Sequence, residues 1–151
     1  SGGTGLAPVL IRRAATLALD WDLRQKSRFD AVDSDGRPVG VVLPRGSVLR
    51  DGDVLVADDG SLRRVVARPQ PVLRVTARDP GSLARAAYHL GNRHVPLEVQ
   101  ADHLQLEPDH VLAEMLLRMG FTVEAVEAPF EPEGGAYEAH MHGPGCDHDH
   151  P

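Results

Sequence analysis

Two prolines separated by one residue, Pro69 and Pro71, divide the chain into halves with different sequence patterns. Such a pair favours a stiff, extended linker, because each ring fixes its own φ angle. Turn pairs and short apolar runs fill the first half, whereas the second half shows helical periodicity. We therefore predict an α+β chain with an all-β amino-terminal domain (residues 1–70), a second domain (residues 71–138) and a flexible, histidine-rich tail (residues 139–151).

The first half alternates turns with segments of strand length. Asp-Gly and Arg-Gly pairs, which suit the positive φ angles of tight turns, occur at residues 35–36, 45–46, 51–52 and 59–60. Apolar runs that are long enough for strands and too short for helices occupy residues 29–32, 39–43, 54–57 and 62–67. These patterns predict a module built from strands alone.

The second half carries signals for two helices and four strands. Asp79-Pro80 and Asp109 are expected to cap the two helices, and Gly91 and Gly120 to end them. The apolar faces of the helices are expected to consist of Leu83, Ala86, Ala87 and Leu90 in the first and Val111, Leu112, Met115, Leu116 and Met119 in the second. The predicted strands are residues 72–77, 95–99, 104–106 and 122–126. The resulting order, βαββαβ, predicts a ferredoxin-like domain with both helices on one face of the sheet.

Composition narrows the class of protein. Aromatic residues make up only 4% of the chain, so the core must consist of Val, Leu and Ala. No apolar run is long enough to cross a bilayer, and a single cysteine cannot form an internal disulfide, which favours a reducing cytoplasm. The residues from Glu131 onward hold five of the 22 acidic residues and none of the 16 basic ones. This charge pattern disfavours nucleic acid as a partner. Pro, Gly and Glu become more frequent after Pro129, and we expect order to fade from there toward the tail.

The tail is a concentration of metal-binding side chains. It holds four of the eight histidines and the only cysteine, namely His140, His142, Cys146, His148 and His150. Imidazole binds nickel, copper, zinc and iron, and thiolate binds the softer of these metals. A purification tag would be an unbroken histidine run, which this segment is not. A passive buffer for zinc or copper remains an alternative, because a flexible tail selects metals only by their intrinsic affinity.

Four histidines lie outside the tail: His89, His94, His103 and His110. His94 lies between the end of a predicted helix and the start of a strand, where a loop can present a side chain without burying it. For the other three, a solvated or structurally satisfied histidine is the better interpretation.

The sequence lacks the common catalytic motifs and the phosphate-binding glycine loops. A nucleophilic role for Cys146 would need a rigid partner base, and the surrounding Gly-Pro-Gly-Cys segment does not provide one. We therefore expect a binding protein rather than an enzyme, with no catalytic residues and no organic cofactor.

Several segments, in the right order along nearly the whole chain, resemble the UreE family of urease accessory proteins. The most specific is the Gly-Asn-Arg-His motif that ends at His94. The others lie at residues 26–28, 43–46, 52–53, 109–112 and 129–137.

The resemblance implies a homodimeric nickel metallochaperone that delivers Ni(II) to the urease maturation machinery, chiefly through the GTPase UreG. It implies that His94 is a metal ligand at the dimer interface, where a two-fold axis supplies two copies of one residue. Some members carry a second histidine two residues before the position of His110. Here that position is Pro108, so His110 ranks low as a ligand.

Together these points predict a Ni(II) site of two His94 imidazoles closed by tail residues. His140 and His142, which lie nearest the folded part, rank ahead of His148 and His150. Zinc or copper are expected to bind in vitro as well, and the amino-terminal domain is expected to dock partners or peptides. The alternatives are a general zinc or copper buffer, and a peptide-binding chaperone whose metal sites only control assembly.

Overall fold

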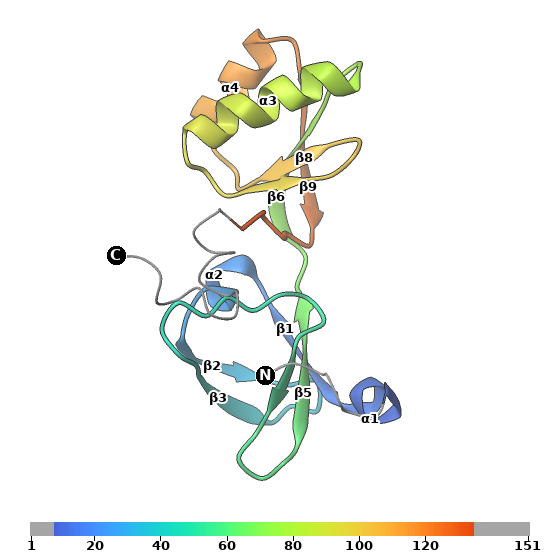
Figure 1. Cartoon of the computed structure of the whole chain (residues 1–151), viewed down its shortest axis with the longest axis vertical. Helices are drawn as coiled ribbons and strands as arrows, with labels where there is room; N and C mark the ends of the chain where they lie inside the picture. The colour runs from blue at the N-terminus through green and yellow to red at the C-terminus, as the bar shows by residue number, and fades with distance from the viewer. Residues whose placement is uncertain (1–7, 135–151) are drawn as a thin grey trace, which may run out of the picture. The chain divides into compact units, whose positions relative to one another are not determined.

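A computed structural model of the chain describes residues 8–134, which form two compact units (Figure 1). Within the described residues, the first unit comprises residues 8–72 and 126–131, and the second comprises residues 73–125 and 132–134. The sequence placed residues 126–131 in the second domain. They join the first unit because Ala128 and Phe130 are buried beside Trp21 and Val72.

The first unit is rich in strands, as predicted. Its elements are α1 (Pro8–Arg13), β1 (Ala15–Leu19), α2 (Trp21–Arg24), β2 (Arg28–Val32), β3 (Pro38–Val42), β4 (Val54–Val56) and β5 (Leu62–Ala67). The four predicted strands are present, and the glycines of the four predicted turn pairs all have positive φ angles, between 82° and 91°. The sequence did not predict β1 or the two short helices, so the unit is not built from strands alone.

Two small sheets surround the core of the first unit. One has the order β1-β5-β4, in which β1 is parallel to β5 and β4 is antiparallel to it, and the other is the antiparallel pair β2-β3. Every second residue of β1 points inward, so that Leu17 and Leu19 are buried while Ala18 between them is exposed. They pack with Phe29, Val41, Leu49 and Val65.

The second unit has the predicted ferredoxin-like order. It contains α3 (Pro80–Asn92), β7 (Leu97–Val99), β8 (Leu104–Leu106) and α4 (His110–Arg118). It also contains most of β6 (Gln70–Thr76) and of β9 (Thr122–Ala128), whose outer ends belong to the first unit. The sheet order is β7-β8-β6-β9, and both helices cover one of its faces (Figure 1). The predicted four-stranded sheet with two helices on one face is therefore confirmed.

The helices begin where the sequence predicted. Asp79 accepts a hydrogen bond from the Ser82 backbone N–H at 2.8 Å, and Asp109 accepts from the Leu112 N–H at 3.0 Å. The apolar face of α4 is narrower than predicted, because Leu112 and Leu116 are buried whereas Val111 and Met119 are exposed. No helix in the described part of the chain is long and apolar enough to cross a membrane.

Candidate metal centre

His94 occupies an exposed turn directly after α3. It has a φ angle of +59° and is the only non-glycine residue with a positive φ between residues 8 and 134. A left-handed conformation costs an L-residue with a Cβ atom about 1–2 kcal/mol, although histidine tolerates it better than branched residues do. Such outliers concentrate at functional sites, so the backbone independently marks the histidine that the sequence motif had singled out.

The prediction that Gly91 ends α3 is wrong, because the helix continues to Asn92. Backbone hydrogen bonds from Arg93 to Leu90 and from His94 to Gly91, at 3.1 and 3.0 Å, close the last turn. His94 therefore takes the left-handed position that follows many helices and is usually held by glycine. Buried Leu90 before the turn and buried Leu97 after it fix both ends of the loop. The imidazole is thus carried by a rigid support and reaches solvent.

His110 directly follows a neighbouring loop. It is the exposed first residue of α4, and the carboxylate of Asp109 before it is bound to the backbone of that helix. A small pocket of about 180 Å³ is lined by Val95 and Pro96, which follow His94, and by Pro108 and Asp109, which precede His110. The two histidine-bearing loops therefore border one depression of the second unit.

The other two histidines of the described part are placed differently. The Nδ1 atom of His103 lies 2.7 Å from the Asp102 carboxylate, and this hydrogen bond lowers the pKa of Asp102. His89 is exposed on α3, with its ring edge-on to Tyr88 at 5.5 Å between ring centres. Unlike His94 and His110, neither residue is adjacent in sequence to a residue that lines the depression.

The last described residues run beside the strand that follows His94. The backbone N–H of Glu133 donates a hydrogen bond of 2.8 Å to the carbonyl of Leu97, the first residue of β7. His94 precedes Leu97 by three residues, which places the two Cα atoms within about 11 Å of each other. His140 follows Glu133 by seven residues, and an extended chain of that length spans up to about 25 Å. The histidines nearest Glu133 are therefore within reach of His94.

An ion pair between buried Arg24 and partly exposed Glu131 precedes this segment, and the sequence did not predict it. Arg24, which is fully buried, donates hydrogen bonds to the Glu131 carboxylate and the Phe130 carbonyl. Glu131 also accepts from the Asp51 backbone N–H at 3.0 Å, and the Phe130 ring packs edge-on against Trp21 at 6.2 Å. These contacts tie residues 130 and 131 to the first unit, ahead of the segment where order is expected to fade toward the tail. No local sequence pattern marks this ion pair, because its partners are 107 positions apart in the chain.

The described residues do not form a complete metal site by themselves. No group of three or more His, Cys, Asp or Glu side chains gathers at metal-binding distance between residues 8 and 134. Of the predicted ligands, His94 and His110 lie in this part, both exposed. The remaining predicted ligands lie outside the described residues: His140, His142, Cys146, His148 and His150.

Comparison with known proteins agrees with this organisation. The family model of the UreE urease accessory protein N-terminal domain matches residues 3–68, and that of the C-terminal domain matches residues 70–151. A urease accessory protein UreE from Albidiferax ferrireducens is 62% identical, covering 98% of this chain and 94% of the relative. A protein of that name from Verminephrobacter eiseniae is 60% identical, covering 99% and 93%. The chain therefore belongs to the UreE family of urease accessory proteins.

Proposed function

We propose that this protein is a metallochaperone that binds Ni(II) and delivers it during maturation of the urease active site. One observation carries the proposal: an exposed histidine, His94, is held in a left-handed turn on a rigid loop, and the segment leading to the histidine-rich tail is bonded beside it. The chain acts as a carrier, with Ni(II) as its cargo, rather than as a catalyst. The match to urease accessory proteins over both domains supports this role.

A homodimer would supply the ligands that one His94 side chain lacks. A two-fold axis near His94 brings two imidazoles together from the same rigid support in each copy. Nickel takes four to six ligands and accepts imidazole well, so the tail residues would complete the set. We rank His140 and His142 first, followed by His148, His150 and Cys146, and place His110 last because its loop borders the same depression without a second histidine at residue 108.

Delivery follows from the division of the ligands between a fixed loop and a tail. A carrier has to bind its ion firmly enough to prevent its loss to solvent and still release it to a recipient. If the tail supplies part of the ligand set, its withdrawal lowers the affinity in one step. The recipient we propose is the urease maturation machinery, chiefly its GTPase UreG. Zinc and copper would compete in vitro, because imidazole sites follow the general order of divalent-metal affinity.

Truncation after Tyr137 separates this function from a passive zinc or copper buffer. We expect the truncated protein to retain a weakened affinity for nickel in calorimetry, because the His94 loop remains. Adding His94→Ala to the truncated protein should abolish the residual binding. Adding His89→Ala, which changes an exposed histidine on the helix before His94, should not. Complete loss of binding on truncation alone would favour the buffer.

A further inference from the structure

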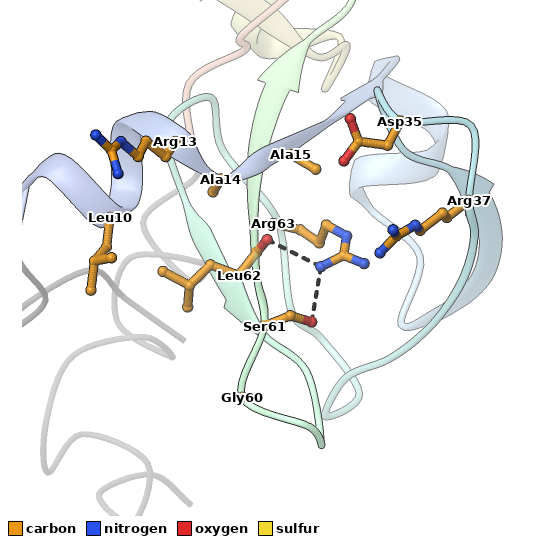
Figure 2. Close-up of a pocket in the computed structure, with 10 residues that line it drawn as sticks. All are labelled: Leu10, Arg13, Ala14, Ala15, Asp35, Arg37, Gly60, Ser61, Leu62 and Arg63. Carbon is orange, nitrogen blue, oxygen red and sulfur yellow. Dashed lines mark hydrogen bonds between the residues drawn. The ribbon is translucent and has the colours of Figure 1, made fainter.

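A pocket of about 440 Å³ lies on the first unit, whose described residues include no histidine. It is formed by α1, the start of β1, the turn after β2 and the start of β5 (Figure 2). Its volume falls within the range of ordinary ligand pockets. Nothing in the proposed nickel chemistry uses it.

One end of the pocket is cationic. The side chains of Arg37 and Arg63 both point into it, toward one another (Figure 2). Arg63 is held rigidly, because its Nε atom donates to the buried carboxylate of Asp33 at 2.9 Å and its Nη1 atom donates to the Ser61 hydroxyl at 3.0 Å. The Arg37 side chain is exposed and forms no hydrogen bond or ion pair with residues 8–134.

The Asp33 carboxylate that holds Arg63 remains ionised. Asp33 accepts backbone hydrogen bonds from Arg37 and Asp35 at 3.0 and 2.9 Å. The bond from the Arg37 N–H is the main cause that lowers the pKa of Asp33. Arg63 therefore keeps an ionised partner at neutral pH. Arg13 also lines the pocket, so the arginines outnumber the carboxylates even when Asp33 is counted with Asp35, the one carboxylate in the lining.

The opposite end, next to α1, carries the apolar side chains of Leu10 and Leu62 (Figure 2). Arg13 lies on this side as well, at the end of α1. Leu10 is 53% exposed, and α1 buries none of its residues. A helix of six residues has little stability of its own, so α1 gains most from a partner that covers this side. The pocket thus offers an apolar surface beside guanidinium groups.

We propose that this pocket binds an acidic peptide segment of a partner protein, with an apolar side chain against Leu10 and Leu62 and a neighbouring carboxylate on Arg37 and Arg63. Guanidinium groups bind carboxylates through charge-assisted hydrogen bonds, and the exposed Arg37 can do so with two parallel N–H groups. Arg63 already donates from Nε to Asp33 and from Nη1 to Ser61 and the Leu62 carbonyl, so it would add its Nη2 group. A small inorganic anion would leave the apolar end in water. The arginine excess specifies the charge of the peptide, and Leu10 and Leu62 specify its apolar anchor. The inference does not depend on nickel.

Fluorescence anisotropy on the full-length, metal-free protein tests the proposal. The probe is a labelled, amidated peptide of alternating glutamate and leucine, and the control peptide carries glutamine in place of glutamate. We expect Arg37→Gln and Leu10→Ser each to weaken binding of the acidic peptide by about fivefold or more. Arg12→Gln and Val9→Ser are matched controls on α1 that lie outside the pocket lining, and they should change the affinity by less than about twofold.

Three results would overturn the proposal. Equal weakening by Arg12→Gln and Arg37→Gln would indicate non-specific attraction to a basic surface. Equal binding of the glutamine peptide would remove the role of the guanidinium groups. Displacement of the acidic peptide by the same concentration of succinate would show that the pocket recognises small carboxylates. The His94→Ala protein should bind the peptide as the unchanged protein does, so failure of the nickel proposal is distinguishable from failure of this one.

Discussion

At the scale of single residues, the left-handed conformation of His94 lowers the stability of the fold, and we attribute it to a function of the side chain. A glycine at this position would adopt a φ angle of +59° without the steric cost that a Cβ atom imposes. The chain places a histidine there instead, in an exposed turn where the side chain packs into no core. A residue that lowers stability without a packing role is best explained by what its side chain binds.

His94→Gly should therefore stabilise the metal-free protein while it removes the proposed nickel ligand. We expect the free energy of unfolding to rise by about 1 kcal/mol in urea titrations, because the left-handed turn no longer carries a Cβ atom. His94→Ala keeps the Cβ atom and serves as the control, with no comparable gain. A glycine variant less stable than the alanine variant would contradict the account of strain at this turn.

The motif ending at His94 was visible in the sequence, but its geometry was not. The resemblance of residues 91–94 to a family motif singled out the histidine, whereas its left-handed φ depends on where α3 ends. Gly91 was the expected terminator, yet burial of Leu90 and the closing hydrogen bonds carry the helix past it. The left-handed position therefore falls at His94, three residues after the glycine that the sequence offered.

At the scale of elements, local signals predicted the second unit better than the first. Asp79 and Asp109 cap helices through contacts with residues two or three positions away, which sequence spacing reveals. The missed strand β1 pairs in parallel with β5, so that Ala15 lies opposite Arg63. Pairing between residues so far apart leaves no local pattern. The Arg24–Glu131 ion pair, which joins residues 107 positions apart, was unpredictable for the same reason.

The backbone hydrogen bond from Glu133 to Leu97 joins the last described residues to the strand that follows the His94 loop. Glu133→Pro removes the donating N–H, whereas Glu133→Ala removes the same side chain and keeps the N–H. We expect the proline variant to bind nickel about threefold to tenfold more weakly, because a tail released from β7 has a lower effective concentration at His94.

Calorimetry with nickel on the full-length proteins measures this effect. The alanine variant should bind as the unchanged protein does. Equal affinity of the proline and alanine variants would show that anchoring at Leu97 does not contribute to the site.

At the scale of the whole molecule, the two compact units carry different chemistry. The second unit holds the His94 loop and the start of the tail, and the first holds a pocket with an apolar and a cationic end. The sequence predicted a strand-rich unit followed by a ferredoxin-like one, because each has its own turn and helix signals. It did not predict that residues 126–131 return to the first unit, since that depends on buried Phe130 and Arg24.

If His94 anchors the nickel site, the His94→Ala substitution should remove high-affinity binding, which calorimetric titration of nickel into the full-length protein measures. His89→Ala is the matched control, since it removes another exposed histidine of the same unit. We expect His94→Ala to lose the high-affinity phase and to keep only weaker binding by the tail, whereas His89→Ala keeps both. High-affinity nickel binding that survives in His94→Ala would show that His94 does not anchor the site.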